Sequence, residues 1–154
     1  MAFVFSRSAG NVSEPATILM AGSGVIRNGM VVEFLRTGGA GVSPAGASTS
    51  FTAIFGVAHD YIQGASDAFT RVTPFTSGQL WIADCTDIAT TAQVGLRHIL
   101  NATGTEIRNT ATDNATGAGI FRAVAMVGAA TGSGKLLGYF ETGSKAAANS
   151  TTLN

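Results

Sequence analysis

Short runs of apolar and β-branched residues recur along this chain at roughly 8–12-residue intervals, separated by glycine- and threonine-rich turn signals. Each run suits a strand and is short for a helix, and such regular spacing is typical of an all-β sandwich or barrel. With 154 residues the chain is long enough for about one domain. We predict an all-β fold, a small antiparallel β-barrel or sandwich at residues 21–143, with an extended N-terminal arm at residues 1–20 and a flexible C-terminal tail at residues 144–154.

Two turn signals predict which strands are neighbours. Asn28-Gly29 lies between the apolar runs at 25–26 and 30–35, and this dipeptide is typical of a tight hairpin turn. The apolar runs at 120–130 and 135–141 are joined by a glycine-rich turn. This arrangement predicts a second antiparallel hairpin near the C-terminus.

Two further segments carry patterns that need interpretation. Residues 87–100 show both helical and strand periodicity, and we expect a short turn or helical piece followed by a strand. Residues 129–136 resemble a phosphate-binding loop. However, Ala129 and Leu136 stand where that motif has glycine and a serine or threonine, so we expect a hairpin turn there.

The chain carries unusually little charge. Only 12% of its residues are charged, against about 25% in an average soluble domain, and nine basic residues balance nine acidic ones. This balance argues against nucleic-acid binding by charge, and the single cysteine excludes a disulfide scaffold. No stretch approaches the roughly 18–20 apolar residues of a membrane span, and we expect a protein made in the cytoplasm that binds no membrane. Because a net charge near zero promotes association, we expect other protein to cover much of its surface.

The candidate catalytic groups are few and scattered. Cys85 is a possible nucleophile with His59 or His98, but the acidic residues beside the cysteine favour its neutral thiol. His59, Asp60 and Asp84 are the candidate residues of an alternative function, a small ligand-binding or hydrolytic barrel. The spacing of these residues matches no zinc or EF-hand pattern, and we expect neither a metal nor a cofactor.

Arginine outnumbers lysine in this chain by seven to two. Arginine prefers planar, partly desolvated contacts at protein interfaces, whereas lysine mostly solvates free surface. The arginine-rich composition therefore favours an assembling protein. Our candidate residues for a subunit interface are Arg71, Trp81 and Arg97.

The order of strands and turns over residues 22–85 resembles the head decoration (cement) proteins of tailed bacteriophages. In these small β-rich proteins a G-x-V-V strand is followed by a GVA…Y…G segment and then by a V-x-V…G…W/V hairpin. The corresponding stretches here are Gly24–Leu35, Ile54–Gly64, Phe69–Val72 and Gly78–Ile82. The family has no catalytic motif, so no catalytic residue can be transferred.

The resemblance implies a structural virion protein rather than an enzyme. Such a subunit sits on the outer surface of an assembled capsid and stabilises it against internal pressure. Its partners are the major capsid protein and further copies of itself, often in a homotrimer. The resemblance also implies that the N-terminal arm contacts the shell, and we expect Phe3, Phe5 and Arg7 to anchor it. The first alternative to this function is another phage structural β-barrel, such as a tail-tube or baseplate subunit, and the ligand-binding or hydrolytic barrel is the second.

Overall fold

The chain folds almost entirely into β-structure. The computed structural model describes residues 3–8, 16–35, 41–50, 52–63, 68–76, 78–112, 119–128 and 132–141. These contain thirteen strands and one short 3-10 helix, and none of their helices is long and apolar enough to cross a membrane. The prediction of an all-β barrel or sandwich is confirmed, and the fold contains a closed barrel, although not every strand pair is antiparallel as predicted.

The first half of the chain forms a closed five-stranded barrel, called barrel 1. Its strands are β2 (Ile18–Gly22), β4 (Val31–Phe34), β5 (Gly41–Pro44), β6 (Ile54–Ala58) and β8 (Phe69–Pro74). They follow the ring order β2-β5-β4-β6-β8, in which β2 and β5 are parallel and the other neighbours antiparallel. Two short strands, β3 (Val25–Ile26) and β7 (Ile62–Gln63), pair with each other, and their isoleucines lie in the barrel 1 core.

The second half forms another closed ring, called barrel 2. Its strands are β9 (Gln79–Ala89), β10 (Arg97–Leu100), β11 (Ile107–Thr112), β12 (Phe121–Met126) and β13 (Ser133–Phe140). Their order is β9-β11-β10-β12-β13, and pairing of β13 with β9 closes the ring. The 3-10 helix η1 (Thr91–Gln93) lies between β9 and β10, and β1 (Val4–Ser8) pairs antiparallel with β9 outside the ring.

The two barrels have the same topology. In each, the first strand is parallel to the third, and the ring order is first, third, second, fourth, fifth. The residue register is also the same. Ile18 lies opposite Val72 in barrel 1, as Ile82 lies opposite Leu137 in barrel 2. Four further pairs of opposite residues match around the ring. With the barrel 1 pair named first and its barrel 2 equivalent second, they are Met20–Thr70 and Asp84–Lys135, Gly56–Pro74 and Arg122–Tyr139, Phe34–Val42 and Ile99–Arg108, and Ala21–Gly41 and Cys85–Ile107.

This correspondence describes an internal structural repeat. Equivalent residues lie about 65 positions apart in the chain. The two repeats differ from each other only by short insertions. Few equivalent positions hold the same residue, and the identical pairs include Ile18 and Ile82, Leu35 and Leu100, Ile54 and Ile120, Phe55 and Phe121, and Phe75 and Phe140. The predicted single domain at residues 21–143 is therefore two repeats of one small barrel.

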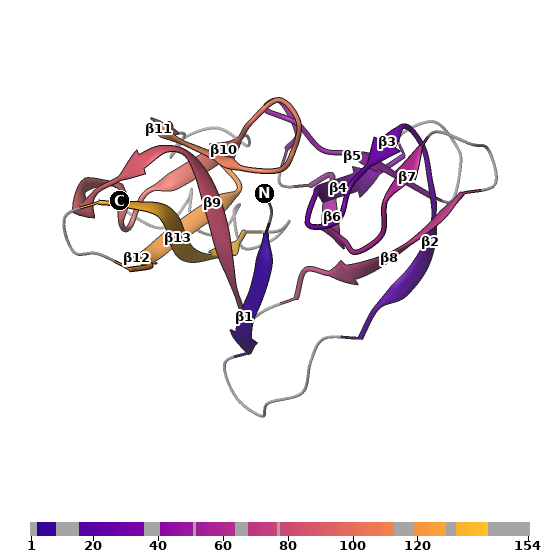
Figure 1. Cartoon of the computed structure of the whole chain (residues 1–154), viewed down its shortest axis with the longest axis horizontal. Coiled ribbons are helices and arrows are strands. Elements are labelled where there is room, and N and C mark those ends of the chain that lie inside the picture. The colour runs from indigo at the N-terminus through magenta and orange to yellow at the C-terminus, as the bar shows by residue number, and fades with distance from the viewer. Residues whose placement is uncertain are drawn as a thin grey trace, which may run out of the picture.

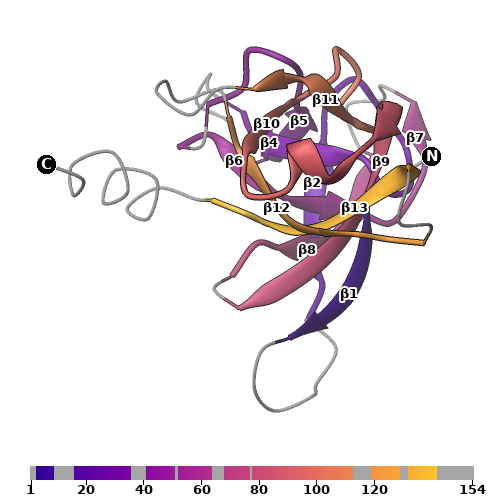
Figure 2. The ribbon, with the colours of Figure 1, turned by 90° about the vertical axis from the view of Figure 1, so that its left-hand side faces the viewer.

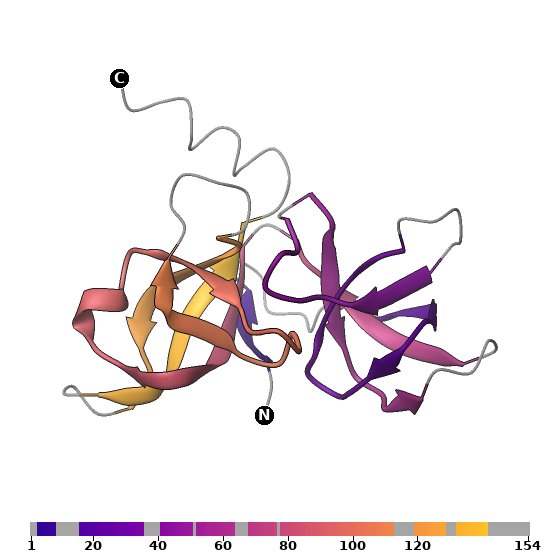
Figure 3. The ribbon, with the colours of Figure 1, turned by 90° about the horizontal axis from the view of Figure 1, so that it is seen from above.

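The barrels lie side by side and share a core (Figures 1 and 3). Figure 2 views the molecule from the barrel 2 side, with barrel 1 behind. At the junction the rings of Phe75 and Phe140, which are equivalent residues, stack with centroids 3.9 Å apart. The junction thus brings one pair of equivalent residues of the two repeats into direct contact.

A loop of barrel 2 also contacts barrel 1 directly. The backbone N–H of Val31 donates to the carbonyl of Gly104 at 2.8 Å. Gly104 has a φ of 69°, and a Cβ there would lie 2.5 Å from the carbonyl oxygen of Ala45. Both the backbone conformation and the close approach therefore require glycine at this position.

Most of the local predictions agree with the structure. The C-terminal hairpin is formed by β12 and β13, and residues 87–100 contain η1 followed by β10. The turn at Asn28-Gly29 is present, but it does not join paired strands, because β3 pairs with β7 instead of β4. Residues 129–131, in the predicted turn, and the predicted tail at residues 144–154 lie outside the described residues.

Candidate interface

The N-terminal segment is part of the fold and not an extended arm. Phe3 is only 3% exposed, and its ring lies 5.2 Å from that of Phe140. The Phe5 ring packs edge-on against Trp81 at 5.6 Å. The backbone of Arg7 pairs with Leu80, and its side chain lies outside the described part of the structure. The expectation that Phe3 and Phe5 anchor an arm to a capsid is therefore wrong, because both rings pack against the core of their own chain.

Two of the three predicted interface residues are also buried. Trp81 is 1% exposed and packs among phenylalanine rings at the centre of the molecule. Arg97 is buried beside Glu141, with its Nη1 3.1 Å from Oε2 of that carboxylate. Arg122 contacts the other carboxylate oxygen through its Nε at 2.5 Å. Arg97 and Arg122 thus share one buried counter-charge, and neither Trp81 nor Arg97 is available to a second subunit.

Arg71, the third predicted interface residue, lies on the surface of barrel 1. Its Nη2 is 2.7 Å from Oδ1 of Asp60, and its backbone N–H donates to Oδ2 at 2.8 Å. These hydrogen bonds lower the pKa of Asp60 to about 2, so the carboxylate stays charged at neutral pH. The paired carboxylate holds the exposed guanidinium in one orientation, as a preformed contact would require.

Two large apolar side chains lie on the same outer surface as Arg71. Leu19 is directly opposite Arg71 in the β2–β8 pair, and Phe69 is two residues before Arg71 on the same strand. Because side chains alternate between the faces of a sheet, all three point outward. Leu19 is 64% exposed and Phe69 is 54% exposed. We call Leu19, Phe69, Arg71 and Asp60 the β2–β8 face.

A groove of about 510 Å³ borders this face. One wall is β1, through Val4 and Phe5, and the other is barrel 1, through residues that include Thr17 and Arg71. His59 lies in the same groove, with its Nε2 2.6 Å from the hydroxyl of Thr73. Burial and the nearby Arg71 lower the pKa of His59, so its imidazole is neutral at pH 7.

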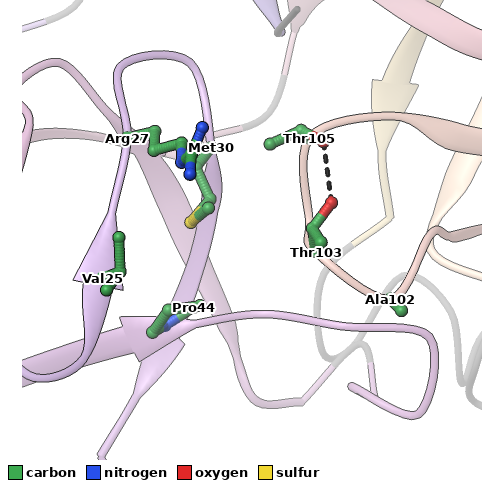
Figure 4. Close-up of a pocket in the computed structure, with 7 residues that line it drawn as sticks. All are labelled: Val25, Arg27, Met30, Pro44, Ala102, Thr103 and Thr105. Atoms are coloured by element: carbon green, nitrogen blue, oxygen red, sulfur yellow. Dashed lines mark hydrogen bonds between the residues drawn. The ribbon is translucent and has the colours of Figure 1, made fainter.

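A second pocket of about 470 Å³ lies between the barrels (Figure 4). Arg27 and Met30 line it from barrel 1, and the loop bearing Thr103 and Thr105 lines it from barrel 2. The two threonine hydroxyls bond to each other at 2.9 Å. Among the described residues, the lining thus offers one guanidinium and hydroxyl groups, without a carboxylate, histidine or cysteine for acid–base or nucleophilic chemistry.

The alternative hydrolytic or metal site is not assembled among the described residues. Asp60 is bonded to Arg71 on barrel 1, whereas Asp84 forms an ion pair with Lys135 on barrel 2. In the part of the chain that the structure describes, no three His, Cys, Asp or Glu side chains gather as metal ligands would. His98 is buried in barrel 2, with its Nε2 2.9 Å from the carbonyl of Gln93.

Cys85 has the environment of an unreactive thiol. Burial, reinforced by the nearby carboxylate of Asp84, raises its pKa from 9.0 to about 12. At pH 8 about one native thiol in ten thousand is then ionised. We expect iodoacetamide to label native Cys85 at least about a hundredfold more slowly than the same thiol in urea, measured by mass spectrometry. Equal rates in the two states would contradict the burial of this side chain.

A scan of protein-family models and a search of curated proteins find no match to this chain. Its candidate site therefore depends on geometry alone. The sequence identified Arg71 by composition, but it did not identify Leu19 or Phe69. Leu19 lies in the apolar run at residues 18–21, where only the closure of the barrel decides which residues point outward. Phe69 lies in a mixed run, and its spacing of two residues from Arg71 is the signal that places both side chains on one face.

Proposed function

We propose that the protein is a structural subunit that assembles with copies of itself on the outside of a bacteriophage capsid and stabilises the shell. The observation that carries this proposal is the β2–β8 face. It combines two exposed large apolar side chains with an arginine whose orientation is fixed. Interfaces are enriched in aromatic residues and arginine at their energetic centres.

The charge of the whole chain supports assembly. Leu19 and Phe69 are exposed on a protein with only 12% charged residues and a net charge of zero. A free monomer with such a surface is prone to association, whereas a subunit in a closed assembly buries it. Obligate interfaces are larger and more apolar than ordinary surface, and this composition fits them.

The choice of a capsid as the partner rests on the resemblance of residues 22–85 to phage head decoration proteins. The resemblance implies a small β-rich subunit, often trimeric, with no catalytic residues. Because Phe3 and Phe5 are part of the fold, the barrel surfaces, and not an N-terminal arm, would contact the shell. The subunit would then be a rigid body that adds its barrels to the shell surface.

The test is co-sedimentation with assembled, empty capsids of a tailed phage. We expect the wild-type protein to bind, and Leu19→Lys to weaken binding at least about tenfold, because a charge on the β2–β8 face breaks the self-association that supplies avidity. Ile88→Lys is the matched control, because Ile88 is 73% exposed on barrel 2 and lies outside this face.

Three outcomes would contradict the proposal. These are no binding by the wild-type protein, equal binding by both lysine variants, and assembly of the protein into tubes that ignore the shell. The last result would favour a tail-tube subunit instead. Circular dichroism of both variants confirms that each has kept the β-fold.

A further inference from the structure

The pocket of about 470 Å³ between the two barrels has walls that are joined to each other (Figure 4). Arg27 and Met30 lie on the barrel 1 wall, and the loop at residues 101–106 provides the barrel 2 wall. The backbone N–H of Val31, next to Met30, donates to the carbonyl of Gly104 in that loop at 2.8 Å. A ligand that enters the pocket therefore does not have to bring the two walls together, which lowers the cost of binding it.

The barrel 2 wall is braced by Asn101. Its Oδ1 accepts from the backbone N–H of Thr105 at 3.0 Å and from that of Glu106 at 3.3 Å. Its Nδ2 donates to the Thr105 hydroxyl at 3.3 Å and to Oε2 of Glu106 at 3.1 Å. The Thr105 hydroxyl in turn bonds to that of Thr103 at 2.9 Å. The polar groups of this wall are thus in place before a ligand binds.

The pocket presents hydrogen-bond donors that the described residues leave unused. The hydroxyls of Thr103 and Thr105 have two protons but share one hydrogen bond, and neither has a further acceptor in the described part of the chain. One hydroxyl proton is therefore available to a ligand. The guanidinium of Arg27 has no carboxylate partner among the described residues either. The pocket is thus a place of unopposed positive charge.

The rest of the described lining is apolar. It consists of Val25, Met30 and Pro44 on barrel 1 and Ala102 on barrel 2. The volume lies within the range of about 300–1,000 Å³ that is typical of sites for small molecules, and such sites combine an apolar lining with a few placed polar groups. An inorganic anion would use the donors and leave the apolar side chains in water. The lining therefore fits a ligand that has both a negative charge and an apolar body.

We propose that this pocket binds a small carboxylate with an apolar body. Arg27 pairs with the carboxylate, because a guanidinium and a carboxylate match in planar, two-point geometry. The threonine pair donates its remaining proton to a polar atom of the ligand. The apolar body lies against Val25 and Met30, whose flexible thioether adapts to its shape. This site is separate from the β2–β8 face and does not depend on binding to a capsid.

Nuclear magnetic resonance with the isotope-labelled full chain tests the proposal, with phenylbutyrate as the probe. We expect saturable shifts of the backbone signals of Met30, Ala102 and Thr103, with a dissociation constant of about 1 mM or tighter. Arg27→Gln should weaken binding at least about tenfold, because it removes a charge-assisted hydrogen bond. Arg108→Gln is the matched control and should bind as the wild type does. Arg108 is exposed on β11 and is absent from the described lining.

Phenylbutyramide, which has the same apolar body without the charge, separates the carboxylate from the hydrophobic contact. We expect the amide to bind at least about tenfold more weakly than the acid. Equal binding of acid and amide would overturn the proposal, as would equal affinities of Arg27→Gln and Arg108→Gln. The absence of saturable shifts in the wild-type protein at millimolar phenylbutyrate would also overturn it, and so would shifts confined to residues outside the pocket.

Discussion

Replacing Glu141 with glutamine should lower the free energy of unfolding by about 3–5 kcal/mol. Glu141 is fully buried, with one carboxylate oxygen 3.1 Å from Nη1 of Arg97 and the other 2.5 Å from Nε of Arg122. The glutamine keeps the shape of the side chain but removes its charge. Arg97 would then be a buried cation that has lost this carboxylate. Removing one partner of a buried ion pair is strongly destabilising, because the charge that remains stays away from water.

Urea unfolding followed by the fluorescence of Trp81, the single tryptophan, measures this loss. Asp60→Asn is the matched control, because it breaks a carboxylate–arginine pair that is exposed to solvent. Water screens that pair, so its loss should be much smaller. Equal losses for the two variants would contradict the role of Glu141. Barrel 1 has Val32, Gly56 and Thr76 at the three equivalent positions, so the shared topology does not itself require the ion network.

Truncating Phe3 to alanine should cost about 3–5 kcal/mol of stability, although this residue is close to the N-terminus. Its ring is 3% exposed and lies 6.1 Å from that of Phe121 and 5.2 Å from that of Phe140. Its backbone N–H also donates to the carbonyl of Gly29 in barrel 1 at 3.0 Å. Removing the ring leaves a cavity where β1 and both barrels meet, and the aromatic cluster cannot close it without moving.

Val4→Ala in the same strand is the matched control. Val4 is 53% exposed, so its truncation should change the free energy of unfolding by no more than about 0.5 kcal/mol. Both variants are compared by the same urea unfolding experiment. If Phe3→Ala were as stable as Val4→Ala, the first strand would be a dispensable arm, as the sequence alone indicates.

The short apolar runs and their glycine-rich turns were enough to predict the all-β class and the β12–β13 hairpin. Such local patterns are sufficient where a strand pairs with its neighbour in the chain. They fail for β1, whose partner β9 begins at Gln79. The arm was predicted from the linker-like stretch after Phe5, and nothing in that stretch identifies the distant strand that β1 joins.

The internal structural repeat was missed for a related reason. Equivalent strands share a register, but Val32 corresponds to Arg97 and Gly56 to Arg122, so polarity changes at aligned positions. The isoleucine–phenylalanine pairs at residues 54–55 and 120–121 are the clearest signal in the sequence. The strand register is more similar between the two repeats than the residue identities are, because many apolar side chains can fill one barrel position.

The candidate interface was predictable only in part. Composition favoured arginine at an interface, and Arg71 lies on the surface as that expectation requires. The same argument included Arg97, because a sequence does not show that Glu141 lies beside it in the fold. Trp81 was the third predicted interface residue. The structure instead places it in the core with Phe5 and Phe75.

The central claim is the proposal that copies of this chain assemble through the β2–β8 face and that the assembly coats a capsid. Light scattering coupled to size separation tests it most directly, on the protein alone and after mixing with empty capsids. The account predicts a mass that is a small whole-number multiple of the chain mass, and a gain in capsid mass that saturates. A protein that stays monomeric at every concentration and leaves the capsid mass unchanged would contradict it.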